Sequence, residues 1–278
     1  MKKDFFEDKK IKFPAYEPWI SDEDKKIVKK TLTQSMLTLG PQLEKFENDF
    51  CKYSKAKYAV AVSNCTAALH LSLMALGIKK DDEVIIPDLT FVADANAILA
   101  CNAKPVIVDI NKENFFLSIS NIKKNITKKT KAIIPVHIYG QVCNIEDILD
   151  VAKDNNLKVI EDCAHAVGTF HKSKHVGTLG NTGCFSFYPT KNITTAEGGM
   201  VITNSEKIAE KVRQLRNHGM TKSLKSRYSS EYPWIFDIKQ QGYNYRLDEI
   251  RAALGISQLK RIKKINGLRK KASSYYNK

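Results

Sequence analysis

Short apolar segments alternate with segments of helical periodicity from residue 57 to about residue 204. Each apolar segment has the length of a buried strand, and together they cover 58–63, 83–87, 105–109, 132–137, 157–161, 184–188 and 200–203. The segments between them carry apolar residues at helical spacing and begin near Ser, Thr or Asp. This alternation is typical of βαβ units. It predicts an α/β fold with a mostly parallel, seven-stranded sheet between helices.

The two ends of the chain have a different pattern. Two outlying helices are predicted before residue 57, in "SDEDKKIVKKTLTQ" and "PQLEKFENDFCKYS", whereas residues 221–240 are polar without periodicity. A long amphipathic helix is predicted over 248–270, with Asp248 near its N-cap and one stripe of Ile250, Leu254, Leu259, Ile262 and Ile265. No further strand follows it. We therefore expect a large domain over 1–247 and the start of an incomplete C-terminal small domain over 248–278.

Composition restricts the class of protein. The chain has 278 residues, of which 43% are hydrophobic, and no apolar run approaches the roughly 18 residues that a membrane span needs. The N-terminus has lysines but no apolar stretch of a secretory signal, so a cytoplasmic location is expected. Six cysteines show neither CxxC pairs nor Cys/His runs at metal-ligand spacing. They are expected to be reduced, and no metal site is predicted.

The charge leaves two interpretations open. There are 45 basic and 30 acidic residues, a formal net charge of +15, which could favour a polyanion partner. The lysines are scattered among acidic and amide residues, which favours a generally lysine-rich surface, with a preference for anionic substrates as the second interpretation. The sequence contains no recognisable helix-turn-helix, RNA-binding or zinc motif, so no nucleic-acid partner is predicted.

Candidate functional residues follow the predicted strands, because ligands of open α/β sheets bind at the carboxyl ends of the strands. Thr66 lies where a strand meets a helix, so it could bind a phosphate or simply cap the helix. Asp162 ends another strand, and its buried carboxylate needs a cation or a hydrogen-bond donor, which a lysine or a protonated ring nitrogen could supply. His165 follows it and could equally be a satisfied core histidine.

Two more residues complete the set. Phe91 begins a predicted helix, where its ring could stack on a flat cofactor or pack in the core. Lys191 stands at a break between two apolar strands, 29 residues after Asp162 and five after Ser186. A phosphate site, an aromatic ring, a carboxylate and a lysine on one sheet are together the requirements of pyridoxal phosphate.

The sequence resembles the DegT/StrS group of sugar-nucleotide aminotransferases, which have the aspartate aminotransferase-like fold. The resemblance extends from about residue 14 to the chain end. It rests on "LTLGPQLEKFE", "SNCTAALHLSL", "PDLTFVADANAI", "VHIYGQ", "VIEDCAHAVGT", "VGTLGNTGCFSFYPTKNITTAEGGMVITN" and "GYNYRLDEIRAALGISQL". Two departures stand out: Ala196 replaces a common glycine, and the chain ends where members of the group continue, which suggests a C-terminal truncation.

The resemblance assigns roles to the candidate residues. It implies that Lys191 forms a Schiff base with pyridoxal 5'-phosphate, that Asp162 pairs with the ring nitrogen, and that His165 lies near the phenolic oxygen. Phe91 would stack on the ring. The remaining positions would bind the phosphate: Thr66, Ala67 and Ser186 within the subunit, and Asn244 in the site of a neighbouring subunit. The last role implies a homodimer.

The resemblance also implies the reaction. An amino-acid donor, by resemblance glutamate, would supply the amino group to a keto-sugar nucleotide, most often a 4-keto-6-deoxy sugar, with 3-keto sugars as the runner-up. The product would be an amino sugar for surface polysaccharides or glycoconjugates. The alternative from another class is a non-catalytic or regulatory protein that keeps the fold and binds polyanions.

Overall fold

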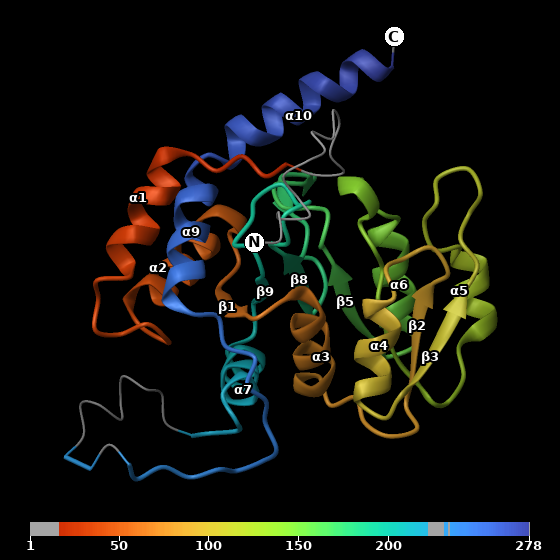
Figure 1. Ribbon diagram of the computed structural model, residues 1–278. Helices are drawn as coiled ribbons and strands as arrows, with labels where there is room; N and C mark the ends of the chain where they lie inside the picture. The colour runs from red at the N-terminus through yellow and green to blue at the C-terminus, as the bar shows by residue number, and fades with distance from the viewer. Residues whose placement is uncertain (1–16, 222–230, 233, 278) are drawn as a thin grey trace, which may run out of the picture.

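A computed structural model describes residues 17–221, 231–232 and 234–277. At its centre is a seven-stranded sheet in the order β1-β9-β8-β5-β4-β2-β3 (Figure 1). The strands are β1 (Tyr58–Val62), β2 (Glu83–Pro87), β3 (Lys104–Val108), β4 (Thr130–Ile133), β5 (Lys158–Asp162), β8 (Thr182–Ser186) and β9 (Gly199–Thr203). Each predicted strand is present, β2 with the predicted bounds and the others with bounds shifted by one to four residues.

The strand directions confirm the prediction of a mostly parallel sheet. Strands β3, β2, β4, β5 and β8 run parallel to one another, whereas β9 is antiparallel to both β8 and β1. The carboxyl ends of β5 and β8 therefore meet at one edge of the sheet, with Asp162 paired in register with Cys184. Loops that follow these two strands are brought to the same place.

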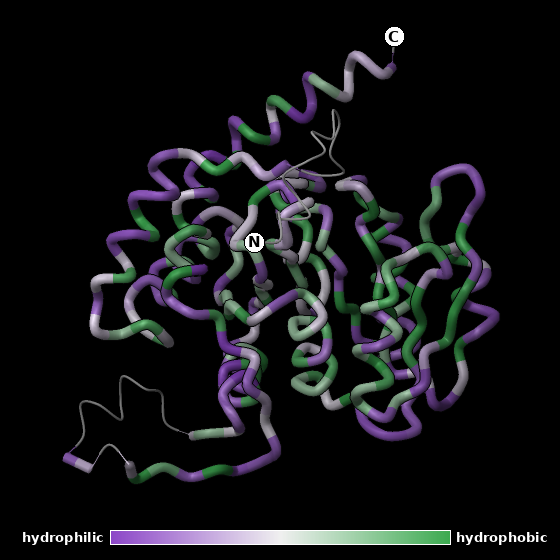
Figure 2. The backbone as a smooth tube through the Cα atoms, viewed as in Figure 1, coloured by the Kyte–Doolittle hydropathy of each residue, from purple (hydrophilic) through white to green (hydrophobic). Residues whose placement is uncertain are grey.

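Helices cover both faces of the sheet, as predicted. One face packs against α3 (Cys65–Ala75), α4 (Ala93–Ala100) and α7 (Glu206–Arg216). The other packs against α2 (Pro41–Ser54) on one side and against α5 (Ile119–Asn125) and α6 (Ile145–Asp154) on the other. The hydropathy colours of Figure 2 place the apolar residues along the strands and polar residues around the outer loops. Both faces are buried, which explains the nearly continuous apolar strands.

The two helices expected before the sheet are α1 (Asp22–Thr31) and α2. A capping box begins α1: the Ser21 hydroxyl accepts from the N–H of Asp24, and the Asp24 carboxylate accepts from the N–H of Ser21. A short hairpin, β6 (Phe170–His171) and β7 (Lys174–His175), and a 3₁₀ turn at Ile138–Gly140 were not predicted. The 3₁₀ turn follows β4 along the chain, and the hairpin follows β5.

The C-terminal segment differs from the single helix predicted over 248–270. Two helices are present, α9 (Glu249–Lys260) and α10 (Ile262–Tyr276), with a break at Arg261. Asp248 caps α9 as predicted, because its carboxylate accepts from the N–H of Arg251 at 2.8 Å. Figure 1 shows α10 projecting from the body toward the C-terminus.

The residues that face the core also differ from the predicted stripe. Leu259, Ile262 and Ile265 are buried as predicted, whereas Ile250 and Leu254 are only half buried. Small residues of α9 face the core in their place, Ala252 and Ala253 among them. A glycine is needed at 255, because a Cβ there would collide with the ring of Phe46 on α2.

The start of the C-terminal segment shares a core with the sheet. Leu247, Ile256 and Ile262 belong to the same apolar cluster as Phe185 of β8 and Ile202 of β9. The expected domain boundary at residue 248 stays a prediction. Half of the predicted polar stretch 221–240 falls on 222–230 and 233, which lie outside the described residues. In the described part of the chain, no helix combines the length and apolarity of a membrane span.

Candidate active site

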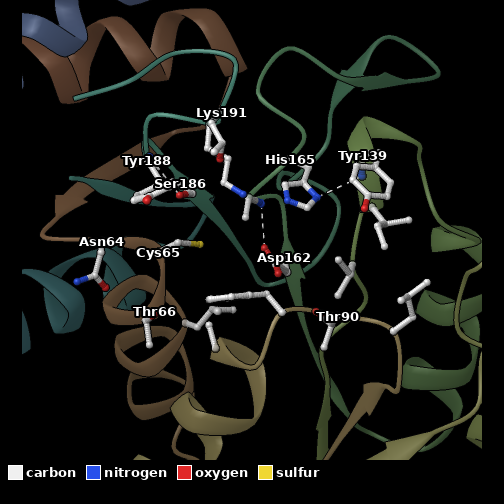
Figure 3. A pocket seen from close by; sticks show the side chains of 18 of the residues that line it. Asn64, Cys65, Thr66, Thr90, Tyr139, Asp162, His165, Ser186, Tyr188 and Lys191 are labelled. Carbon is white, nitrogen blue, oxygen red and sulfur yellow. Dashed lines mark hydrogen bonds between the residues drawn. The ribbon is translucent and has the colours of Figure 1, made fainter. Parts of the chain in front are cut away.

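A cavity of about 740 Å³ opens at the carboxyl ends of β5 and β8. Six of the residues predicted from the sequence line it, namely Thr66, Phe91, Asp162, His165, Ser186 and Lys191. They come from helix starts and strand ends that are far apart in the sequence, and Figure 3 shows that the labelled members of this set surround one space. The sequence therefore identified a set of residues that the fold does bring together.

The N-terminus of α3 forms one wall. Asn64 caps the helix, and its side-chain oxygen accepts from the N–H of Ala67 at 2.8 Å, while its carbonyl accepts from the N–H of Ala68 at 3.1 Å. The first N–H groups of a helix have no partner within the helix. Those of Cys65 and Thr66, which line the cavity, therefore remain for a ligand.

Asp162 lies at the floor of the cavity. Its side chain is almost fully buried, and one carboxylate oxygen accepts from the N–H of Ala164 at 2.8 Å. Burial raises the pKa of Asp162, and the Ala164 N–H and the positive charge of Lys191 oppose that rise. Within the described residues, no salt bridge joins Asp162 to a basic side chain. A cationic group in the cavity would be a suitable partner.

Lys191 enters the cavity from the loop that follows β8. Its backbone N–H donates to the carbonyl of Tyr188 at 2.9 Å, which closes a tight turn. Figure 3 shows the side chain extending toward Asp162 and His165. Burial lowers the pKa of the Lys191 ammonium, and the negative charge of Asp162 partly opposes the change. A lysine in this state gives up its proton more readily than an exposed one.

His165 forms the third side of the cavity together with Tyr139. Their rings stack with centroids 5.4 Å apart and an angle of 7° between the planes. The backbone N–H of Tyr139 donates to Nδ1 of His165 at 3.3 Å. Burial, followed by the positive charge of Lys191, lowers the pKa of His165 to about 4. The imidazole is therefore neutral at physiological pH, with Nε2–H as its donor.

Glu161, the residue before Asp162, belongs to a separate buried network. Its carboxylate accepts from the N–H groups of Gly177, Leu179 and Gly180 at 2.7–2.8 Å and pairs with Nε2 of His137 at 3.0 Å. Cys163 lies close enough to complete a three-residue cluster of metal-ligand types. Both oxygens of Glu161 already accept from two donors each, so this network stabilises the loop before β8 and does not suit a metal ion.

Two predicted residues do not line the cavity. Ala67 is buried, and its N–H is occupied by the Asn64 side chain, so it is not free to donate to a ligand in this structure. Asn244 is exposed on a segment anchored to the end of β1, since the N–H of Ser63 donates to the carbonyl of Tyr245. Its contribution to a neighbouring subunit stays a prediction.

The sequence did not point to several other residues that line the cavity: Thr90, Tyr139, Tyr188 and Glu197. Tyr139 could have been predicted, because it comes two residues after the predicted strand 132–137, in a position similar to that of Asp162 after its own strand. The backbone φ of 50° at Tyr139 could not be predicted, because this left-handed conformation is usually indicated in a sequence by glycine or asparagine.

Comparison with known proteins finds several similar aminotransferases. GDP-perosamine synthase of Escherichia coli O157:H7 is 41% identical over 266 residues, which are 95% of this chain and 70% of that protein. Helicobacter pylori PseC, an aminotransferase of pseudoaminic acid biosynthesis, is 34% identical with a TM-score of 0.82, over 90% of this chain and 66% of that one. Spr1654 of Streptococcus pneumoniae in its PMP form has a TM-score of 0.90 and 29% identity, over 95% of this chain and 71% of that one.

The chain thus spans about two thirds of the length of the relatives that it matches. These neighbours confirm the expected aspartate aminotransferase-like α/β fold. A sequence model described as the DegT/DnrJ/EryC1/StrS aminotransferase family matches residues 18–278, which include every residue of the cavity. The chain belongs to the DegT/DnrJ/EryC1/StrS aminotransferase family.

Proposed function

We propose that this chain transfers an amino group from an amino acid to a keto-sugar nucleotide, with pyridoxal 5'-phosphate in the cavity at the ends of β5 and β8. The observation that carries the proposal is the position of Lys191 opposite Asp162 in one cavity, with the free start of α3 at its wall. These three features come from separate parts of the chain and serve one cofactor.

The residues of the cavity fit the cofactor. The unpaired N–H groups at the start of α3, with the hydroxyls of Thr66 and Ser186, suit a phosphate. The buried carboxylate of Asp162 suits a protonated ring nitrogen, and the donor Nε2–H of His165 suits an oxygen on the ring. When bound, pyridoxal phosphate supplies an aldehyde for a covalent bond to an amine and a ring that withdraws electrons from that bond.

Lys191 is proposed to have two tasks. Its Nζ would hold the cofactor covalently between reactions, and once displaced by the donor amine it would take the proton from that donor's α-carbon and pass it on to the cofactor. The second task needs a neutral amine, and burial lowers the pKa of Lys191 in that direction. Asp162 keeps its negative charge beside a cation, which offsets the cost of burying it.

Phe91 is proposed to cover the exposed side of the bound ring. It lines the cavity but is 73% exposed in the isolated chain, so a bound ring would bury apolar surface that water now contacts. The Tyr139–His165 stack lies at another edge of the same opening. Asn244 is proposed to reach the phosphate of a second subunit in a homodimer, because it lines no part of its own cavity.

The acceptor is proposed to be a 4-keto-6-deoxy sugar on a nucleotide, with glutamate as the donor. The support is the match to GDP-perosamine synthase and to PseC, whose names describe amino-sugar products. The net charge of +15 is compatible with a diphosphate-linked substrate.

Trapping with borohydride tests the proposal. The protein is incubated with pyridoxal phosphate, reduced, digested and mapped, and the label is expected on Lys191 alone. Lys191→Ala should lose both the label and the transamination of L-glutamate, because no other cavity residue is a lysine. A label distributed over surface lysines, unchanged by Lys191→Ala, would show that the assignment is wrong.

A further inference from the structure

The start of α10 contacts the loop that carries Lys191. The side-chain oxygen of Asn266 on α10 accepts from Nδ2 of Asn192 at 2.7 Å, and Asn192 directly follows Lys191. The guanidinium of Arg269, one turn farther along, donates to the carbonyl of Lys191 at 3.2 Å and to that of Thr190 at 3.5 Å. Three consecutive residues of the loop are thus held by one helix.

The same asparagine also holds the loop that follows β5. Nδ2 of Asn266 donates to the carbonyl of Val167 at 3.1 Å, and Nδ2 of Asn192 approaches that carbonyl at 3.4 Å. Val167 lies two residues after His165 and five after Asp162. The amide of Asn266 is therefore a bridge between the loop of Lys191 and the loop of Asp162 and His165.

The neighbouring backbone leaves room for this bridge. Gly168 has a φ of 87°, and a Cβ at this position would collide with Nδ2 of Asn266 and with the hydroxyl of Tyr53. Any larger residue would push the amide away from Val167. Both asparagines are half buried, so their hydrogen bonds compete less with water than exposed ones would.

We propose that the Asn192–Asn266 amide pair is a positioning device that sets where Lys191 lies relative to Asp162 and His165. The inference rests on the proposed role of Lys191 and extends it to residues that do not line the main cavity. Without the pair, Lys191 would be tied through its turn with Tyr188 and through Arg269, and its side chain would sample more positions. A covalent partner of Lys191 would then be held less firmly.

Three variants and one control test this inference. Asn192→Ala, Asn266→Ala and the double variant remove the bridge, and Lys263→Ala is the control, because Lys263 is an exposed residue of α10. For each, the dissociation constant for pyridoxal phosphate and the pH midpoint of its visible absorbance are measured. Amide hydrogen exchange is followed on the cofactor-free protein, and thermal unfolding reports whether each variant folds.

The expected result is a dissociation constant raised about tenfold in each single variant, with the double variant close to either single one because the two side chains act as a unit. The pH midpoint should move by at least about 0.3 unit. Exchange at the amide of Lys191 should become faster while exchange in β8 is unchanged. Lys263→Ala should behave as the unaltered protein.

Failure of the positioning role can be distinguished from failure of the proposed function. If borohydride labels Lys191 in the unaltered protein but the asparagine variants match it in affinity, pH midpoint and exchange, the positioning role is wrong and the proposed function stands. Variants that melt at lower temperature yet keep the same midpoint and exchange at Lys191 would also overturn the inference, since the pair would then be purely structural. No label on Lys191 in the unaltered protein would remove the basis of both.

Discussion

The backbone N–H of Tyr139 donates to Nδ1 of His165, and the same two residues stack ring on ring. Tyr139 takes a φ of 50° to do so, a conformation that is costly for a residue with a bulky side chain. Because Nδ1 accepts a hydrogen bond, the proton of the neutral ring lies on Nε2. The strained turn therefore determines which atom of His165 can donate into the cavity.

The first prediction is that His165 stays neutral down to about pH 4. Its pKa in the folded state lies below the ordinary value of 6.5, so the unfolded chain binds this proton first as the pH falls. Its contribution to stability is complete above pH 6.5 and declines between 6.5 and about 4. Nitrogen-15 NMR of the imidazole should show the Nε2–H tautomer at pH 7, and a midpoint between 6 and 7 would contradict the prediction.

The second prediction concerns the carboxylate of Asp162. Asp162→Asn keeps the shape but removes the charge that would stabilise a protonated ring nitrogen, so the half-reaction with L-glutamate should slow by about 10²-fold or more. Asp162→Glu keeps the charge with displaced geometry and should lose less. Stopped-flow absorbance of the cofactor-loaded variants measures both rates. Near-normal turnover in Asp162→Asn would mean that the carboxylate has a structural role only.

The strands were predictable because each is a short apolar run, and most of them are buried on both faces of the sheet. The hairpin of β6 and β7 was not, because two residues per strand carry no measurable periodicity. The break between α9 and α10 was also hidden. The apolar residues Leu259, Ile262 and Ile265 continue across Arg261, so their spacing does not mark the break.

Some residues of the candidate site could likewise be predicted from the sequence, and others could not. Lys191 and Asp162 were found because a charged residue after an apolar strand is unusual and because parallel strands place such residues at one edge. The hydrogen bond from the N–H of Ala67 to the Asn64 side chain could not be predicted, because it depends on the rotamer that Asn64 adopts as the helix cap. Asn266 was hidden too, since its link to the site is made through loops more than 70 residues away.

The third prediction is that Asp94→Asn stabilises the protein at pH 8. Asp94 on α4 is fully buried, and the hydroxyl of Thr90 donates to one oxygen at 2.6 Å, while the other oxygen has no partner in the described part of the chain. Burial, and then the negative charge of Asp162, raise the pKa of Asp94 well above its usual 3.8. An amide removes the buried charge, and the gain should be on the order of 1 kcal/mol.

The direction in which pH changes stability through Asp94 follows from its pKa values in the folded and unfolded chain. The unfolded chain loses this proton near 3.8 and the folded chain only at a higher pH, so the native state is favoured most at low pH and loses that advantage as the pH rises. Urea unfolding at pH 5 and pH 8 should show a larger gain for Asp94→Asn at pH 8. The exposed Asp88→Asn is the control and should show no such difference. An Asp94→Asn variant that is less stable at pH 8 would indicate an ionised, well-paired carboxylate.

The last prediction concerns Ala196, which follows Lys191 in the same loop. Its φ is 65°, in the left-handed region, and its N–H donates to the hydroxyl of Thr194 at 3.0 Å. A side chain in this conformation costs about 1 kcal/mol relative to glycine, and the residue is exposed, so removing its Cβ leaves no cavity. Ala196→Gly should therefore raise the free energy of unfolding by up to about 1 kcal/mol. The greater conformational entropy that glycine gives the unfolded chain reduces this gain.

The matched control is Ala272→Gly, the same change at an exposed position within α10. There the backbone is helical, so glycine should lower stability by up to about 1 kcal/mol. Urea unfolding of both variants measures the two effects with opposite signs expected. If Ala196→Gly destabilised the protein as Ala272→Gly does, the turn at 196 would not be strained, and the alanine would be as well suited to this loop as a glycine.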